Sequence, residues 1–337
     1  MPTTSGWNPK ANLNCASMAL TLEEYAEHLE KRPDLAWPAP PEVQPPKAKP
    51  CLVSLPEIRV VTWSVYGTLL AISGGELYLQ HPQKFVMELA LDKTLQEFKM
   101  WKAMTRKPGH PAAQLHLMYN NALSDLQLVA GNERHPDVDV AKVWESIVKK
   151  LLTNEYVFDT GFYGSLDDYA RKIAYFFHAS LQGTACYEGA AETLQDLQRI
   201  LGRRGGCMGL LADGQCFTPV QLHRALLRQG LKTNWETLIP SPLRVLSYEV
   251  RAKKPSERLF REMLRRLKER GYEPREVLHV GSHLLHDVAP ARKLGMRTAL
   301  FAGDKASLHA NGEQLRQPQS RPDVLLTELP QVLEVFA

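Results

Sequence analysis

Residues 59–72 read RVVTWSVYGTLLAI, an apolar run that leads into a Gly-Thr turn. Such a run, rich in β-branched and aromatic residues and closed by a turn, is typical of a buried strand. Its polar residue, Ser64, stands where the strand ends. Because ligands of open parallel sheets bind beyond the carboxyl ends of the strands, we expect Ser64 to lie at a functional site.

The part of the chain after Cys186 alternates between helical and apolar patterns. Apolar runs at 207–211, 277–280 and 297–301 indicate buried strands, and amphipathic runs lie between them. Helices that alternate with buried strands predict a parallel sheet covered by helices on both faces. The predicted fold class is therefore α/β, with a Rossmann-like parallel sheet as its core.

Two helix starts are marked by capping motifs. Thr218 and Gln221 form a Thr-x-x-Gln pattern with Pro219 at the first helical position. Ser165 and Asp168 mark the start of another helix. In such motifs the first side chain accepts a hydrogen bond from the backbone of the first turn.

Residues 76–185 show helical periodicity throughout, which predicts an all-helical insert in the core. Three apolar stripes recur at three- and four-residue spacing, and we expect them to form the insert's own core. They are Met87, Leu91, Leu95 and Phe98; Val140, Trp144, Ile147, Val148 and Leu151; and Tyr169, Ile173, Phe177 and Leu181. The predicted division is 1–55 for an amino-terminal extension, 56–75 and 186–337 for the α/β core, and 76–185 for the insert.

The amino-terminal extension holds one short predicted helix and a proline-rich run. Thr21 and Glu24 form a capping box, and the helix carries an apolar stripe of Leu22, Tyr25, Ala26 and Leu29. Prolines from 33 to 50 indicate an extended segment. We expect a tether that packs loosely over the domain. The alternative is a docking peptide for a protein partner, with Leu22, Leu29 and Trp37 as anchors.

Composition narrows the class of protein. The chain has 337 residues, 44% of them hydrophobic, and a formal charge of +4 that is spread over 41 basic and 37 acidic residues. This balance does not favour nucleic-acid binding. No apolar run reaches the roughly 20 residues of a membrane helix and no secretory signal is evident, so we expect a cytoplasmic protein. The five scattered cysteines, Cys15 among them, indicate neither disulfides nor a zinc site.

Four short segments, in this order and spacing, resemble the haloacid dehalogenase superfamily of hydrolases over residues 56–336. They are SVYGT with Ser64, Tyr66, Gly67 and Thr68; LLADG with Ala212, Asp213 and Gly214; KKP with Lys254; and VGSHLLHD with Ser282 and Asp287. The helical insert stands where that family places its cap. The resemblance implies a family-type α/β core with these residues around one site.

The resemblance also implies a nucleophilic Asp at the first position of SVYGT. In the family's phosphatases this Asp and an Asp of the fourth segment hold Mg²⁺, a hard cation that prefers charged oxygen ligands. Here the two positions are Ser64 and Ser282, so we expect no family-type Mg²⁺ site and no cofactor. The family's metal-free dehalogenases share the Tyr66 and Ser282 pattern, yet their mechanism also begins with the missing carboxylate.

A serine at the nucleophile position impairs both family mechanisms. Attack by Ser64 on a haloacid would give an ether, and attack on a phosphate ester would give a phosphoserine, and water releases neither adduct easily. We therefore expect an impaired enzyme whose pocket binds a small anion. Lys254, the Ser64 and Ser282 hydroxyls and the amides of the Tyr66-Gly67-Thr68 and Gly214 turns would hold it. The simplest alternative is a relic pocket in which Lys254 is only paired with Asp287.

Other functions stay open at this point. Ser64 with Lys254 would make a Ser-Lys catalytic pair. The cluster of His279, His283, His286 and Asp287 would hold a transition metal, although His279 is expected to point into the core. Asp213 would serve as the carboxylate of an active hydrolase, acting on phosphate esters or 2-haloacids. Finally, the chain would be an interaction protein if residues 1–55 carry its function.

Overall fold

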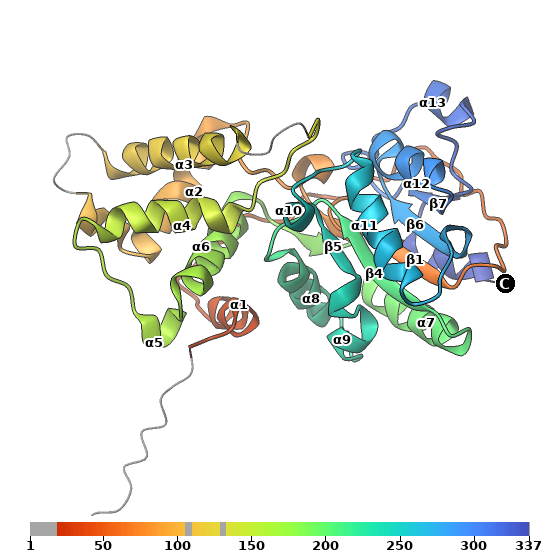
Figure 1. The fold of residues 1–337 in the computed structure, drawn as a ribbon, viewed down its shortest axis with the longest axis horizontal. Helices are drawn as coiled ribbons and strands as arrows, with labels where there is room; N and C mark the ends of the chain where they lie inside the picture. The colour runs from red at the N-terminus through yellow and green to blue at the C-terminus, as the bar shows by residue number, and fades with distance from the viewer. Residues whose placement is uncertain (1–18, 105–109, 129–132, 337) are drawn as a thin grey trace, which may run out of the picture.

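The computed structural model describes residues 19–104, 110–128 and 133–336. Its core is a six-stranded sheet in the order β5-β4-β1-β6-β7-β8, in which every neighbouring pair is parallel (Figure 1). The strands are β1 (Val60–Trp63), β4 (Cys207–Ala212), β5 (Arg244–Leu246), β6 (Val277–Gly281), β7 (Arg297–Phe301) and β8 (Val324–Leu326). The predicted α/β fold is confirmed. The two edge strands, β5 and β8, were not predicted, because three residues are too few to show a periodic pattern.

Helices cover both faces of the sheet, as the alternation of patterns predicts. One face carries α7 (Ala190–Arg203) and α8 (Thr218–Arg228), and the other carries α11 (Glu257–Lys268) and α12 (Ala289–Lys293). Each pair shares an apolar cluster with the side chains of the strands beneath it. The shorter elements of the core are η1 (Ser73–Gly75), α9 (Trp235–Leu238), η3 (Ser241–Leu243), α10 (Ser247–Val250), η4 (Pro274–Glu276), the π turn η5 (Leu284–Val288), α13 (Gly312–Arg316) and η6 (Leu329–Phe336).

The insert, called the cap from here on, forms a separate layer of helices beside the core (Figure 1). It contains α2 (Lys84–Glu97), η2 (Met100–Ala103), α3 (Pro111–Leu128), α4 (Val140–Leu152), α5 (Thr160–Tyr163) and α6 (Leu166–Leu181). The antiparallel pair of β2 (Leu70–Ala71) and β3 (Ala185–Cys186) joins its two connections to the core. All three predicted stripes are buried in one apolar cluster.

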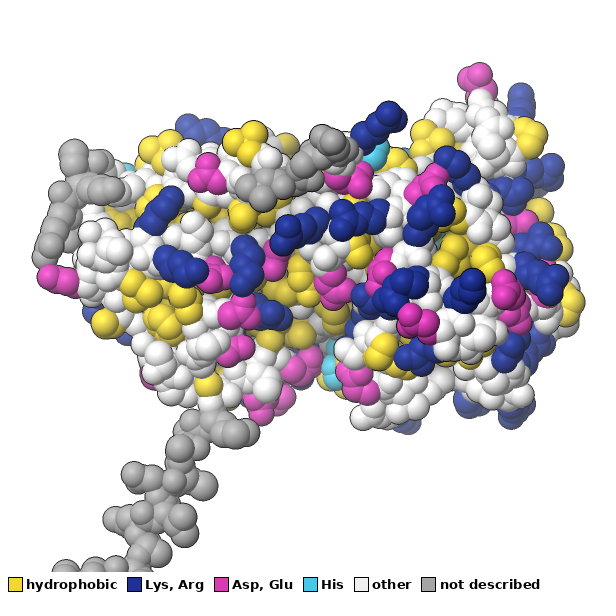
Figure 2. Space-filling model, in the orientation of Figure 1, with side chains coloured by type: hydrophobic (Ala, Val, Ile, Leu, Met, Phe, Trp, Pro, Cys, Tyr) yellow, Lys and Arg dark blue, Asp and Glu magenta, His cyan; other side chains and the backbone are white. Residues whose placement is uncertain are grey.

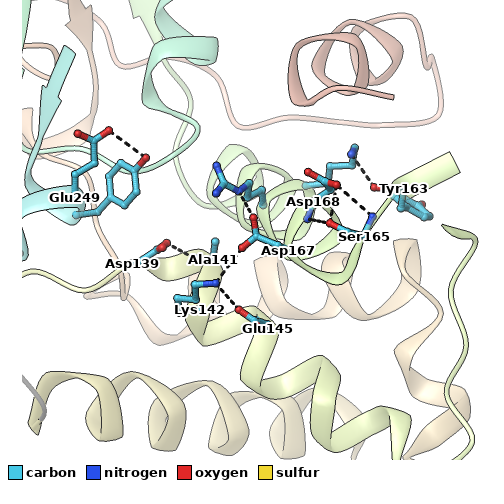
Figure 3. Close-up of polar contacts among 12 residues, drawn as sticks. Asp139, Ala141, Lys142, Glu145, Tyr163, Ser165, Asp167, Asp168 and Glu249 are labelled. Carbon is cyan, nitrogen blue, oxygen red and sulfur yellow. Dashed lines mark hydrogen bonds and ion pairs between the residues drawn. The ribbon is translucent and has the colours of Figure 1, made fainter. Parts of the chain in front are cut away.

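Side-chain hydrogen bonds mark the starts of two cap helices, of which only that of α6 was predicted. Asp139 accepts a hydrogen bond from the amide of Ala141 at the start of α4, at 2.9 Å. Figure 3 also shows the predicted capping box of α6, in which the Ser165 and Asp168 side chains each accept from the other's backbone amide. Lys142 pairs with Asp167 at 3.0 Å and so connects α4 to α6.

The capping box predicted for α8 is wrong. The helix begins at Thr218 without a side-chain cap, and Pro219 lies in its first turn. Instead, the Thr218 hydroxyl accepts a hydrogen bond from the Gln215 amide at 2.8 Å, and the Gln221 side chain accepts one from the Tyr66 hydroxyl at 2.6 Å. A distant tyrosine thus uses the polar group that the local pattern assigned to the helix end.

The amino-terminal segment packs more closely than a loose tether would. Helix α1 (Leu22–Glu30) carries the predicted Thr21–Glu24 capping box. Its Tyr25 and Leu29 side chains are buried, and the helix contacts both α6 of the cap and α8 of the core. The prediction of loose packing is therefore wrong for these residues. Cys15 and the rest of residues 1–18 lie outside the described part of the chain.

The structure also shows whether any helix could cross a membrane and how the surface charges are distributed. Among the described residues, no helix combines the length and the apolar character needed to cross a membrane. On the face drawn in Figure 2, basic and acidic side chains are interspersed over both the cap and the core.

Candidate ligand-binding site at the carboxyl ends of the strands

A cavity of about 240 Å³ lies at the carboxyl ends of β1, β4 and β6. Core residues supply most of its wall, namely Ser64, Tyr66, Asp213, Gly214, Gln215, Lys253, Lys254, Ser282, His283, His286, Asp287 and His309. The cap and its first connection add Glu76, Leu77, Leu79 and Asp137. The cavity therefore lies between the core and the cap.

Lys254 is the centre of the polar contacts in this cavity. Its side chain is only 2% exposed, and its ammonium group donates to the Ser64 hydroxyl at 3.1 Å and to Asp287 at 2.5 Å. Its backbone amide donates to Asp213 at 2.9 Å. Four of the residues predicted from separate segments of the sequence are thus joined in one network.

Asp287 is an ionised acceptor held by three donors. Besides Lys254, it accepts hydrogen bonds from the His279 ring at 3.3 Å and from the His283 amide at 2.9 Å. Burial alone would raise the pKa of Asp287, but the charge of Lys254 and the hydrogen bond from His279 outweigh it and hold the pKa well below its usual range. The carboxylate thus neutralises Lys254, as the simplest alternative expected.

His279 is a structural partner of Asp287 and faces away from the cavity. Its Nε2 lies against Asp287, which as a carboxylate can only accept, so the proton is on Nε2 and Nδ1 accepts from the Thr62 hydroxyl at 3.0 Å. The ring meets Phe260 edge-on under α11. Burial lowers the pKa of His279, so the ring is neutral at pH 7. Its predicted orientation into the core is confirmed.

Asp213 is a buried carboxylate of the cavity whose charge changes with pH near neutrality. Burial raises the pKa of Asp213 to about 6, although the charge and the amide of Lys254 act in the opposite direction. At pH 7 most molecules therefore carry a negative charge here, and below pH 6 most do not. Ala212, just before it, is fully buried in β4 and does not line the cavity.

The turn after β1 does not present its amides as expected. The Gly67 amide donates to the Leu70 carbonyl at 2.8 Å, the Thr68 amide to the Val65 carbonyl at 3.2 Å, and the Gly214 amide to the Ser247 hydroxyl at 2.9 Å. The prediction that these three amides bind an anion is therefore wrong, because the turns use them internally. The Tyr66 amide differs, since no acceptor for it is found within the described residues.

Glycine at position 67 is required by the conformation of this turn. Its φ is +74°, and a Cβ there would lie 2.9 Å from both the Ser282 hydroxyl and the Gly75 carbonyl oxygen. The turn therefore brings the segments of Ser64 and Ser282 close together because Gly67 has no side chain.

The cap contributes a residue that the sequence did not point to. Asp137, between α3 and α4, is buried, accepts from the Ser247 hydroxyl at 2.5 Å and lies 3.7 Å from the Lys253 ammonium. Burial raises its pKa. Besides the adjacent Val138 amide, its partners Ser247 and Lys253 lie more than a hundred residues away, so nothing in the local sequence marks Asp137 as a cavity residue.

Three imidazoles stack at one side of the cavity. The rings of His283 and His286 are parallel at 3.7 Å, and His309 stacks on His283 at 4.7 Å. Burial lowers the pKa of His283 to about 4 and also lowers that of His286, so both rings are neutral at pH 7. Within the described residues no group of three His, Cys, Asp or Glu side chains could hold a metal ion, so a transition-metal cluster is not supported.

The residues present also do not fit the Mg²⁺ of the phosphatases. The two positions expected to carry metal-binding carboxylates hold the hydroxyls of Ser64 and Ser282, and the Lys254 ammonium donates to the first of them. The nearby Asp287 carboxylate is already paired with that ammonium. A cation placed there would meet a positive charge and neutral ligands, which Mg²⁺ does not favour.

Comparisons with known proteins agree with this architecture. Residues 251–332 match the model of a family described as HAD-hydrolase-like. The Rhythmically expressed gene 2 protein of Drosophila melanogaster is 23% identical over 253 residues, which are 73% of this chain and 84% of that protein. Glyceraldehyde 3-phosphate phosphatase of Pyrococcus furiosus is 30% identical over 149 residues, 44% of this chain and about half, 53%, of that enzyme.

Among solved structures, the 2-haloacid dehalogenase from Pseudomonas syringae pv. Tomato DC3000 is similar with a TM-score of 0.50 at 20% identity. The match covers 82% of this chain and 97% of that one. The chain therefore has a haloacid dehalogenase-like fold with helical insertions.

Proposed function

We propose that this chain is a homologue of the haloacid dehalogenase-like hydrolases whose pocket binds a small anion without turning it over. The observation that carries the proposal is a hydroxyl at the carboxyl end of β1, that of Ser64, which the Lys254 ammonium contacts at 3.1 Å. A hydroxyl there cannot form the acyl-type ester that water opens in the family's mechanism. Binding at the site is therefore separated from turnover.

Donors for an anion remain at this position. An ammonium group has three protons, and Lys254 uses two of them on Ser64 and Asp287. Its third proton, the Ser64 and Ser282 hydroxyls and the Tyr66 amide would point at a ligand seated against the end of β1. The hydroxyls and the amide are neutral, and the charge of Lys254 is already balanced by Asp287, so the site favours an anion of low charge.

The charge and the shape of the cavity favour a small carboxylate over a phosphate. A phosphate dianion would approach the carboxylates of Asp213 and Asp287, while only one of the two lysines, Lys254, is fully buried with them. Leu77 and Leu79 add an apolar wall, and 240 Å³ suits a body of a few carbons. The proposed ligand is thus a short monocarboxylate with an apolar chain.

The test is binding and turnover with the same set of compounds. Thermal shift and calorimetry with propionate, butyrate and inorganic phosphate should show stabilisation by the carboxylates, by about 2.7 kcal/mol at a hundredfold the dissociation constant. Ser64→Ala should weaken carboxylate binding, and Ser241→Ala, at an exposed position of η3, should not. Equal stabilisation by phosphate would contradict the preference for a single charge.

Turnover separates the proposal from an active hydrolase. With p-nitrophenyl phosphate and with 2-chloropropionate, with and without Mg²⁺, we expect no more than one equivalent of product per protein. Multiple turnover that Ser64→Ala abolishes would refute the proposal. Multiple turnover that survives Ser64→Ala but is lost in Asp213→Asn would show that Asp213 acts as a substitute carboxylate.

A further inference from the structure

The amino-terminal segment runs along both the cap and the core. Residues 19–52, called the strap from here on, begin with α1, which contacts α6 (Figure 1). They then pass the second connection of the cap at Gly183 and end against β8, at the edge of the sheet. The strap is joined by contacts to each of these parts in turn.

The strap holds the cap through aromatic and ionic contacts. Tyr25 meets Phe162 edge-on at 6.4 Å between ring centres, and Trp37 meets Phe176 in the same way at 5.3 Å. Arg32 pairs with Glu97 of α2 at 2.5 Å, and both side chains are mostly buried. These contacts are spread over α2, α5 and α6.

A second set of contacts joins the strap to the core. Glu30 pairs with Arg224 and with Arg228 of α8, the latter at 2.6 Å. Further along, the Gln44 amide donates to the Asp304 carboxylate at 3.1 Å, and the Gln44 carbonyl accepts from the Lys305 amide at 2.8 Å, both in the loop after β7. Cys51 then pairs with Leu325 of β8 through two backbone hydrogen bonds.

Between these two sets the strap lies directly on the connections that join the cap to the core. The two connections, residues 72–83 and 182–186, are held together by the Gln182 side chain, which accepts from the Tyr78 amide at 2.8 Å. A Cβ placed on the next residue, Gly183, would overlap the carbonyl oxygens of Pro38 and Ala39. The strap backbone therefore touches the point about which the cap would rotate.

We infer that the strap fixes the position of the cap over the cavity. A rotation of the cap away from the core would separate Glu30 from α8 or Trp37 from α6, and it would pull the strap across Gly183. Because the cap and its connection supply Leu77, Leu79 and Asp137 to the cavity wall, the strap also controls how open the cavity is. This inference does not depend on what the cavity binds.

Gly183→Ala tests the inference in the full-length chain. The glycine does not have a positive φ, so alanine fits its backbone, and the three atoms nearest to the added Cβ all belong to the strap. The matched control is Gly202→Ala in α7, where a Cβ would meet no atom within 4 Å. Amide hydrogen exchange, read by mass spectrometry, reports local opening in each segment.

We expect Gly183→Ala to raise exchange rates in the strap and in both connections at least tenfold, with β4 and β6 unchanged, and the control to leave all segments unchanged. Faster exchange in the strap alone, with protected connections, would show that the strap does not hold the cap and would overturn the inference. Unchanged exchange everywhere would do the same.

A second pair of variants tests the strap with substitutions that lie outside the two connections of the cap. Trp37→Ala deletes an anchor of the strap on α6, and Trp101→Ala deletes a partly exposed tryptophan on the cap surface. The first should loosen the connections as Gly183→Ala does, and the second should not. Equal effects of the two tryptophan variants would assign the change to general destabilisation of the cap and contradict a role of the strap.

Discussion

The ion pair of Lys254 and Asp287 offers the sharpest test of how the site is built. Asp287→Asn keeps the shape of the side chain and an acceptor for the His283 amide, but it removes the charge opposite Lys254. The two side chains are 2% and 4% exposed, so the buried ammonium would keep the Ser64 hydroxyl as a hydrogen-bond partner but lose the carboxylate that directly contacts it. Breaking a buried pair in this way costs about 3–5 kcal/mol of the free energy of unfolding.

That loss is a large part of the 5–15 kcal/mol that is typical of folded domains. Urea denaturation at pH 7, followed by the fluorescence of tryptophans such as the buried Trp63 of β1, should measure it. Glu269→Gln is the matched control, because Glu269 pairs with Arg265 at the same 2.5 Å but with side chains 64% and 56% exposed. A surface pair of this kind is worth about 0–1 kcal/mol.

The double variant Lys254→Met with Asp287→Asn completes the test. Removing the unpaired charge should restore more than half of the lost stability, since the penalty comes from the buried ammonium and not from the absence of the pair. A loss below 1 kcal/mol in Asp287→Asn, or a double variant as unstable as the single one, would refute the reasoning.

Three further outcomes are expected at and beside the site. The pKa of Asp213 is raised in the folded state to about 6, above its ordinary value of 3.8, so protonation of Asp213 stabilises the fold as pH falls from 7 toward 4, and this stabilisation is lost as pH rises through 6. Carboxylate binding, measured by calorimetry, should also strengthen below pH 6. Asp213→Asn should flatten the pH dependence of both the stability and the binding. Gly67→Ala should lower the free energy of unfolding by about 1–2 kcal/mol or more in urea titrations, because φ is +74° and the Cβ meets Ser282, whereas Gly202→Ala should have no such effect. Restoring carboxylates with Ser64→Asp and Ser282→Asp together should create Mg²⁺ binding detectable by calorimetry, and its absence would contradict the view that the two hydroxyls are what excludes the metal.

Local sequence patterns were sufficient to predict much of the fold. The α/β core, the helical character of the cap and the capping boxes at Ser165 and Thr21 depend on side chains one to four residues apart, and all of them are confirmed. The family resemblance then placed Ser64, Lys254 and Asp287 near one another, and the hydrogen bonds join them as expected.

Other features were decided only when distant segments met. The sequence pattern predicted that Thr218 and Gln221 cap a helix. In the structure both side chains instead hydrogen-bond to the Tyr66 hydroxyl, about 150 residues earlier in the chain. Asp137 reaches the cavity only because the cap folds back over the sheet. The strap looked like a tether because proline-rich sequence specifies extension but not what the extended chain lies on.

The sequence by itself therefore determined the longer helices, the central strands and the motif residues of the site, since these follow from local periodicity and from motif spacing. Only the tertiary structure decided which donors are already used, which carboxylates face the cavity and how the cap is held. The reason is physical: hydrogen bonding, desolvation and charge pairing act between neighbours in space, and in this chain those neighbours are far apart in sequence.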